Sequence, residues 1–239
     1  MFDNFGLFVS TIADGLLLTV EATIGGIVLA TALSFLAGLA MLSRFTAVRV
    51  ITRVYVEIWR GTSEVVQLFW IYFALPVLTG FQILPLWAGI FVLGLNFGAY
   101  GAEIVRGAVQ SVPREQREGC VALNFSPAQR MRRVILPQAF VDMVPPFNNL
   151  FIQLLKGTAL LTFITVPEMT YQASQVLVTR YTGQAALIWT TVLVFYLVLS
   201  VLITTGMKVL ERRAAARVGR TPVRRTAALG GASGHSGVA

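Results

Sequence analysis

The sequence predicts an all-α membrane protein with about five transmembrane helices. Of its 239 residues, 56% are hydrophobic and only 13% are charged, whereas a soluble domain usually carries about 25% charged residues. The mean hydropathy is +0.73, and several stretches of membrane-spanning length, about 20 residues, contain no charge. These observations exclude a soluble enzyme, a nucleic-acid-binding domain and a disordered chain.

The uncharged runs set the number of spans. Ala22–Ser43 has the length of one membrane crossing, and its glycines permit close helix packing. The run from 65 to 102 would measure about 57 Å as one helix, so it has to fold back, and Pro76, Gly80 and Pro85 mark the turn. The predicted spans are Ala22–Ser43, Thr62–Leu78, Pro85–Val105, Val144–Val166 and one helix within Tyr181–Met207.

The basic residues predict the orientation. With five spans, every lysine and arginine except Lys156 and Arg180 falls on one side of the membrane, and that side is the cytoplasm. The N-terminus is therefore expected outside and the C-terminus inside. Topology explains the formal net charge of +8, so we expect no nucleic-acid partner. Acidic Asp14 and Glu21 precede the first uncharged run, which indicates a retained helix and not a cleaved signal peptide.

The chain divides into a transmembrane domain, 1–211, and a basic cytoplasmic tail, 212–239. The tail has too little apolar content to pack and is predicted to be disordered, with its arginines either solvated or lying on the membrane surface. The sequence holds one cysteine, Cys120, and one histidine, His235. We therefore expect no disulfide framework, no metal site and no cofactor.

The polar loop 106–137 is predicted to contain two short helices. Pro113 suits the first turn of the first helix, and Arg114 and Glu118 are spaced i, i+4 as an ion pair requires. Asn124 suits the left-handed residue that ends a helix. The loop is thus expected to be folded.

The second short helix of this loop has clear start and stop signals. Ser126 and Pro127 suit its N-cap and first position, and the helix is expected to stop before Pro137, because the residue before a proline disfavours helix. A folded, charged hairpin of this kind is either a docking platform for a partner or an amphipathic element resting on lipid headgroups. The physical arguments alone favour neither.

The loop resembles the cytoplasmic motif of binding-protein-dependent ABC importer permeases, in which Glu-Ala-Ala, a glycine and Leu-Pro stand at fixed spacing. Here the motif begins at Glu118 and ends at Leu136-Pro137. Three further stretches resemble the polar amino acid branch of that family, in family order across about residues 11–210. They are Arg60-Gly61-Thr62 with Gln67-Leu68-Phe69, Ala102-Glu103 with Arg106-Gly107, and Leu155-Lys156-Gly157-Thr158 with Val166-Pro167-Glu168.

The chain departs from the family pattern in the loop and in the spans. The loop departures are Gly119 and Cys120 for two alanines and Asn124 for the glycine. The span departures are Ser63-Glu64 for Pro-Leu, Gly157 for the acid of a Lys-Asp-Thr-Ser stretch, and Ala159 for its serine. Coupling to an ATPase is expected to survive these changes, whereas the substrate cannot be carried over from the branch.

The resemblance implies a type I ABC importer architecture in the bacterial inner membrane. Two permease subunits, identical or sister chains, form a pore within the lipid, and an extracytoplasmic binding protein delivers the substrate. A separate ATP-binding subunit supplies hydrolysis, since this chain has no Gly-rich Lys-Ser/Thr phosphate loop; the chain itself is then a transport subunit and no enzyme. The residues implied in coupling to the ATPase are Glu118, Gly119, Leu123, Asn124, Ser126 and Pro137.

Ionisable residues inside spans are the first candidates for the substrate path, because a charge at mid-bilayer costs at least about 2.5–3.5 kcal/mol. Lys156 is expected near the midplane, where it meets a substrate carboxylate or pairs with Glu103 or Glu64. A helix break at Gly157 would expose backbone groups to a ligand, and Glu103 is also spaced i, i+3 from Arg106 for an ion pair. The predicted path residues are Lys156, Gly157, Thr158, Glu103, Tyr100 and Asn96.

The expected substrate is a zwitterion, because Lys156 and Glu103 supply one charge of each sign. The missing acid at position 157 argues against arginine, lysine or histidine. The run from Ala122 to Pro127 is similar to permeases of ectoine and hydroxyectoine uptake, so an ectoine-like solute and a polar amino acid are both candidates. The alternative functions are a secondary transporter, which would require an inverted repeat, and a non-transporting membrane scaffold subunit.

Overall fold

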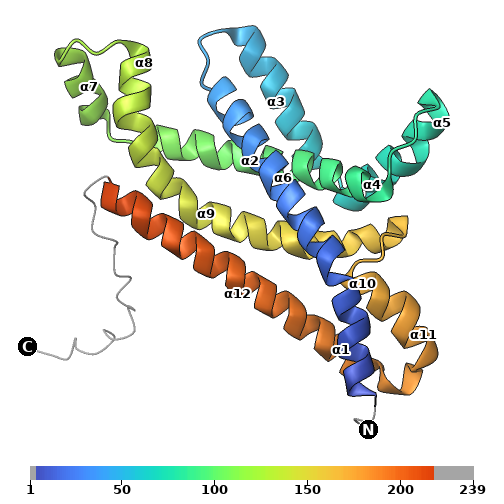
Figure 1. Ribbon diagram of the computed structural model, residues 1–239. Helices are drawn as coiled ribbons and strands as arrows, with labels where there is room; N and C mark the ends of the chain where they lie inside the picture. The colour runs from blue at the N-terminus through green and yellow to red at the C-terminus, as the bar shows by residue number, and fades with distance from the viewer. Residues whose placement is uncertain (1–3, 218–239) are drawn as a thin grey trace, which may run out of the picture.

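The computed structural model describes residues 4–217, which are helical along most of their length (Figure 1). The first half comprises α1 (Phe5–Asp14), α2 (Leu16–Ala40), α3 (Thr46–Gly61), α4 (Glu64–Phe69), a π-turn (Trp70–Ala74), α5 (Leu75–Thr79) and α6 (Pro85–Ser111). The second half comprises α7 (Arg114–Ala122), α8 (Pro127–Arg130), a π-turn (Met131–Ile135), α9 (Leu136–Gly157), a 3₁₀ segment (Thr158–Ile164), α10 (Met169–Tyr171), a π-turn (Gln172–Leu177), α11 (Val178–Arg180), a short 3₁₀ turn (Thr182–Gln184) and α12 (Ala185–Arg217).

The predicted all-α class and the number of spans are confirmed. Four helical stretches within the described residues are long and apolar enough to cross a membrane, namely Phe5–Ala40, Pro85–Ser111, Pro127–Ile164 and Thr182–Ala216. A fifth crossing results if Thr46–Gly61 and Glu64–Thr79, which are bent by 104° relative to each other, are counted as one broken span.

The broken span corrects the predicted start of the second crossing at Thr62. Residues 46–61, which were expected to form a cytoplasmic loop, form helix α3. Arg49, Arg53 and Arg60 interrupt the apolar run there, but their spacing places them on one face of a helix. The other face is apolar, so α3 is an amphipathic helix.

Other helices extend beyond their predicted bounds. The first apolar helical stretch begins at Phe5 and not at Ala22, because α1 ends at Asp14 with only Gly15 before α2, and the exposed Glu21 interrupts the apolar run without ending α2. At the other end, α12 continues to Arg217, so residues 212–217 of the predicted tail are helical. The rest of that tail lies outside the described residues.

Helices α2 and α6 make the most extensive helix pair of the fold. The hydroxyl of Ser34 on α2 donates to the carbonyl of Ala30, 2.6 Å away, and lies 3.3 Å from the carbonyl of Gly98 on α6. Gly38 on α2 is so close to α6 that a Cβ atom there would lie 2.6 Å from Cβ of Val105. The glycines of this run therefore permit close packing, as predicted.

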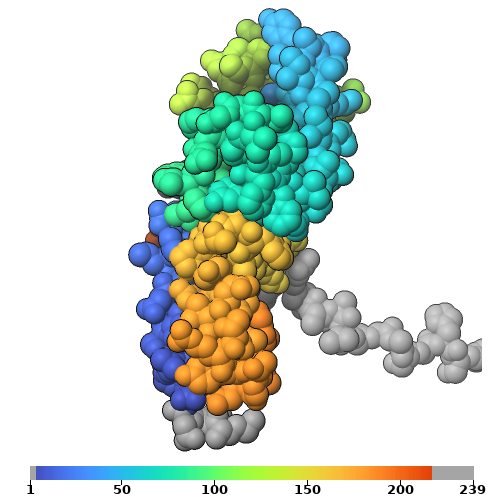
Figure 2. All heavy atoms as spheres, turned by 90° about the vertical axis from the view of Figure 1, so that its right-hand side faces the viewer, coloured from blue at the N-terminus to red at the C-terminus, as the bar shows by residue number. Residues whose placement is uncertain are grey.

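Two apolar cores organise the remaining helices. The larger core joins α2, α6 and α9 and includes Leu93, Phe97 and Leu154. The smaller core includes Phe8 and Met169 and joins α1 to the segments around α10 and α11 and to the start of α12, at one end of the molecule in Figure 1. Figure 2 shows this end, with α1 alongside the segment from about 165 to 180, and α3–α5 forming a separate part of the same surface.

The close α2–α6 contact predicts the effect of one added methyl group. In the Gly38→Ala variant, Cβ would lie 2.6 Å from Cβ of Val105 and 2.7 Å from the carbonyl oxygen of Ala102, so the helices have to separate. We expect a loss of about 1–3 kcal/mol in the free energy of unfolding, measured by denaturation in detergent. Gly107→Ala on α6, where a Cβ meets nothing within 4 Å, is the matched control; equal stability of the two variants would contradict the prediction.

Candidate functional site

The break between α3 and α4 leaves backbone groups that need partners inside the bilayer. α3 ends at Gly61, and Thr62 and Ser63 are extended before α4 begins at Glu64. The carbonyls of the last α3 turn therefore lack their helical donors. An unsatisfied carbonyl in hydrocarbon costs several kcal/mol, so side chains must supply the hydrogen bonds.

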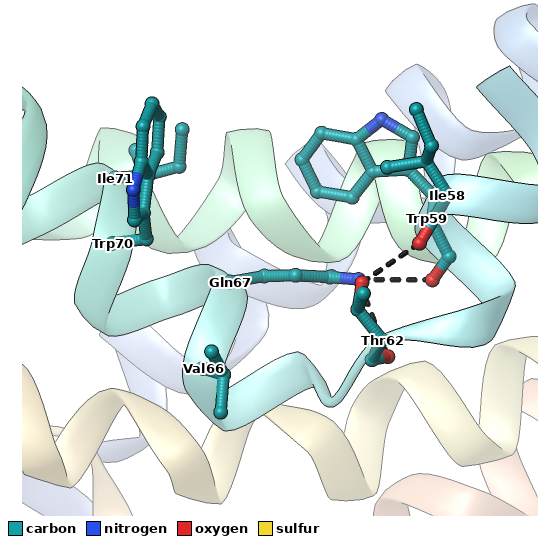
Figure 3. Close-up of a pocket in the computed structure, with 7 residues that line it drawn as sticks. All are labelled: Ile58, Trp59, Thr62, Val66, Gln67, Trp70 and Ile71. Atoms are coloured by element: carbon teal, nitrogen blue, oxygen red, sulfur yellow. Dashed lines mark hydrogen bonds between the residues drawn. The ribbon is translucent and has the colours of Figure 1, made fainter. Parts of the chain in front are cut away.

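Two buried amide side chains donate hydrogen bonds to the backbone at the break between α3 and α4. Gln67 Nε2 donates to the carbonyl of Trp59 at 2.9 Å and to Thr62 Oγ1 at 2.6 Å (Figure 3). Asn96 Nδ2, from α6, donates to the same Trp59 carbonyl at 2.9 Å and to Gln67 Oε1 at 2.9 Å. The predicted path residue Asn96 thus fixes the corner between α3 and α4.

The pocket drawn in Figure 3 lies beside this corner and has a volume of about 330 Å³. It is lined by Ile58, Trp59, Thr62, Val66, Gln67, Trp70 and Ile71. The lining is almost wholly apolar and carries no charge, so the pocket lacks the groups that a zwitterion requires. We therefore place the candidate substrate site at the neighbouring charged residues.

A charge cluster lies on the same face of α6 as Asn96. Glu103 accepts hydrogen bonds from Arg106 at 2.6 and 2.8 Å, the predicted i, i+3 pair, and lies 3.9 Å from Arg60 of α3. The Arg60 guanidinium stacks over the ring of Tyr100, 5.2 Å from its centroid. Asn96, Tyr100 and Glu103 therefore all face the α3–α4 break, and two guanidiniums share the single carboxylate of Glu103.

The fourth span changes its helical geometry at Gly157 but stays helical to Ile164, so the break expected there is not a gap in the helix. The regular α9 helix ends at Gly157 and continues as a 3₁₀ segment. Lys156 is exposed and, within residues 4–217, forms no ion pair with Glu103 or Glu64. Thr158 points elsewhere: its buried hydroxyl donates to the Leu155 carbonyl at 2.7 Å.

Gly157 faces a residue that the sequence analysis mentioned only as a pairing partner. A Cβ atom at position 157 would lie 3.6 Å from Glu64 Oε2 and 3.2 Å from Leu93 Cδ2. Of the predicted path residues, Asn96, Tyr100 and Glu103 therefore form one group, Gly157 lies beside Glu64, and Thr158 belongs to neither.

The predicted helical hairpin of the loop 106–137 is also present. Arg114 pairs with Glu118 at 2.8 Å, and Asn124 has the left-handed conformation with φ 57°. Ser126 caps α8 through a capping box with Gln129. The hairpin exposes Leu123, which is 71% accessible, and space is open around Gly119.

The expected helix stop before Pro137 is wrong. Leu136 is helical, with φ −60° and ψ −44°, and the chain runs from α8 through the π-turn Met131–Ile135 directly into α9. A proline inside a regular helix loses one hydrogen bond and presses its ring against the carbonyl four residues earlier. The wider π-turn accommodates this interruption, so Pro137 lies in the first turn of a continuing helix.

Two polar contacts tie α7 to the membrane helices. Pro113 has no N–H, so the carbonyl of Val109 on α6 lacks its regular i+4 donor. Arg117 Nη2 donates to that carbonyl at 2.6 Å. On the other side, Gln138 of α9 donates to Gln116 of α7. The hairpin is therefore attached to both α6 and α9.

Glu168 is a buried carboxylate that the sequence analysis noted only as part of a motif. Its oxygens accept hydrogen bonds from the backbone N–H groups of Thr170 and Tyr171, both at 2.8 Å, from Thr162 Oγ1 at 2.7 Å and from the Tyr196 hydroxyl at 3.2 Å. It is the only charged residue between Lys156 and Arg180. This isolated charge is the sequence signal that could have identified it as a candidate residue. Its role is to cap α10.

Comparison with known proteins decides the family. Residues 9–216 match the binding-protein-dependent transport system inner membrane component. The chain belongs to this family. It is 38% identical over 209 residues to the probable amino-acid ABC transporter permease protein y4tF of Sinorhizobium fredii, covering 85% of this chain and 87% of the relative. It is 36% identical over 201 residues to the glutamine transport system permease protein GlnP of Escherichia coli, covering 84% and 91%.

Solved structures agree with this family. A crystal structure of an amino acid ABC transporter with histidines superposes with a TM-score of 0.78 at 29% identity, covering 89% of this chain and 98% of that chain. The MetNI methionine ABC transporter matches with a TM-score of 0.67 at 22% identity, covering 88% and 97%, which supports the fold. The chain is thus an amino acid ABC transporter permease subunit, a multi-pass inner membrane protein and not an enzyme, and its family implies an ATP-binding subunit and a binding protein as partners.

The corner at Gln67 predicts the cost of removing its amide. Gln67→Leu leaves the Thr62 carbonyl without its donor and removes one of the two acceptors of the Asn96 amide, so we expect a loss of about 1–3 kcal/mol in the free energy of unfolding, measured in detergent. Gln153→Leu, at an exposed position on α9, should be close to neutral. A Gln67→Leu variant as stable as this control would contradict the account of the broken span.

Glu168 predicts a pH dependence of stability. Burial raises the pKa of this carboxyl above its ordinary value of 4.5, although the four hydrogen bonds partly lower it. The native state therefore holds the proton at pH values where the unfolded chain has released it, and stability falls as pH rises through the raised pKa. In denaturation measured between about pH 5 and pH 7, the wild type should lose stability relative to Glu168→Gln as pH rises. A constant difference between the two proteins would refute this assignment.

Proposed function

We propose that the chain imports a zwitterionic solute, a polar amino acid or an ectoine-like compound, and that the loop 113–137 couples this transport to a separate ATP-binding subunit. The observation that carries the proposal is the double attachment of α7. Arg117 joins it to the end of α6, and Gln116 joins it to the start of α9. A force applied to the hairpin therefore reaches both helices that carry the charged residues.

The charges in the spans support a zwitterionic substrate. α6 carries Glu103 with its two guanidinium partners. Lys156 lies at the end of the regular α9 helix and has no ion-pair partner in the described part of the chain. Relatives named for a zwitterionic substrate include the glutamine permease and, in Bacillus subtilis, a permease of L-cystine transport, whereas another relative there is named for arginine transport. The ectoine-like solute is supported by the similarity of the run 122–127.

The exposed surface fits a second permease subunit and lipid. Large apolar side chains are exposed on several helices, including Leu17 and Leu36 on α2, Ile51 on α3, and Leu193 and Leu202 on α12. A transmembrane helix exposes such residues only to lipid or to another helix. A pore between two permease chains, identical or sister, would cover part of this surface, with the N-terminus outside and the hairpin in the cytoplasm.

Uptake into proteoliposomes tests the proposal. The assembly of this chain with its ATP-binding subunit and binding protein should import labelled glutamine or ectoine only when ATP is present on the ATPase side, and competition between the two solutes identifies the preferred one. Flux without ATP would indicate a secondary transporter. Absence of flux with the ATPase still bound would indicate a scaffold subunit.

The attachment of α7 predicts a coupling defect. Arg117→Ala removes the bond to the Val109 carbonyl, so ATP hydrolysis should continue while uptake per ATP hydrolysed falls by about tenfold, the effect of losing one hydrogen bond to a charged group. Arg114→Ala is the matched control, because Arg114 pairs only with Glu118 at the exposed surface and such pairs contribute little. Equal transport-to-hydrolysis ratios in the two variants would reject the proposed route of coupling.

A further inference from the structure

The break between α3 and α4 lies beside the point where α9 changes to a 3₁₀ helix, and one carboxylate lies between them. α4 begins at Glu64, and the regular helix α9 ends at Gly157. A Cβ atom at position 157 would lie 3.6 Å from Glu64 Oε2, with Leu93 Cδ2 and Phe97 Cε2 at 3.2 and 3.4 Å on the other sides. Because residue 157 has no side chain, the carboxylate of α4 reaches the end of α9.

Glu64 and Lys156 are charged groups of opposite sign without partners in this region. Within residues 4–217, the partly buried Glu64 carboxylate accepts no hydrogen bond and forms no ion pair, and the Lys156 ammonium forms none either. Glu103, in contrast, is already engaged by Arg106 and Arg60. An ionisable residue in a span that has no protein partner is the first candidate for contact with a transported solute.

We propose that Glu64 binds the cationic group of the transported zwitterion and that Lys156 binds its carboxylate. This inference rests on the proposed transport function and assigns the acidic contact to Glu64 in place of Glu103. Glu103 then acts as a positioning residue, because it holds the Arg60 guanidinium of α3 at 3.9 Å on the other side of the same break.

The assignment also explains two departures in the sequence. Glu64 stands where the family pattern has an apolar residue, and Gly157 stands where it has an acid. The two positions are far apart in sequence but adjacent in space. The negative charge has therefore been moved from α9 to α4, and the path still carries one acid beside Lys156.

Charge removal at Glu64 is the first test, in the complete transporter in proteoliposomes. Glu64→Gln should lower kcat/KM for uptake of a zwitterionic probe, glutamine or ectoine, by about tenfold to a hundredfold, as expected for the loss of a hydrogen bond to a charged group. Glu57→Gln, an exposed glutamate of α3 in the same broken span, is the matched control and should transport normally.

Moving the acid back is the second test. Glu64→Leu combined with Gly157→Asp returns the carboxylate to α9, where the Cβ atom alone requires Leu93 to shift by a few tenths of an ångström. The double variant should recover uptake that Glu64→Leu alone has lost. Gly157→Asp alone places two carboxylates at the site and should shift preference from zwitterions toward arginine or lysine.

The outcomes separate this inference from the proposed function. If the wild-type assembly shows no ATP-dependent uptake of any probe, the transport function fails and the inference fails with it. If the wild type transports and Glu64→Gln matches Glu57→Gln, only the assignment of Glu64 is overturned. In a further outcome, Glu64→Leu loses uptake, Gly157→Asp does not restore it, and the assemblies remain intact by size-exclusion chromatography. This result identifies a structural role for Glu64 and also overturns its assignment as a substrate contact.

Discussion

The constraint on which the structure depends is that backbone groups inside a bilayer need hydrogen-bond partners from the protein itself. The chain breaks one span by 104° and therefore has to supply donors for the carbonyls around Trp59 and Thr62. Gln67 and Asn96 both donate to the Trp59 carbonyl at 2.9 Å, and Gln67 Nε2 lies 3.3 Å from the Thr62 carbonyl and 2.6 Å from its hydroxyl. Since these amides fix the corner, they also fix where the charged residues on either side of it stand.

Helix α6 connects this corner to the rest of the molecule through two different faces. One face carries small residues and packs closely on α2, where Gly98 and Gly101 lie next to Ser34. The other carries Leu93, Asn96 and Glu103, which face Gly157, the corner and Arg60 respectively. Because α2 and α6 pack so closely, α6 has little freedom to move without α2. Any displacement of α6 also moves Leu93, Asn96 and Glu103 together.

The sequence was sufficient for features that depend on local chemistry. Residue type and spacing within a few positions account for four such features. They are the left-handed Asn124, the cap at Ser126, the ion pair of Glu103 with Arg106 and the end of the regular α9 helix at Gly157. Helix α3 could also have been predicted, because its charged residues share one face of a helix. It was missed because only uncharged runs were counted as spans, and an amphipathic helix contains charges. The stop expected at Pro137 failed because a π-turn, which has no sequence signal of its own, carries the helix past the proline.

The arrangement of the site could not be read from the sequence, since it depends on which distant positions become neighbours. Nothing in the spacing of Glu64 and Gly157 indicates that they touch, nor that Arg117 bonds the carbonyl that Pro113 leaves without a donor. Pro113 has no N–H and so leaves a carbonyl that the distant Arg117 satisfies, whereas Gly157 has no side chain and so leaves room for the Glu64 carboxylate. Arg117 thus joins the hairpin to α6, and Glu64 reaches from α4 to the end of the regular α9 helix, so each long-range contact depends on what a nearby residue lacks.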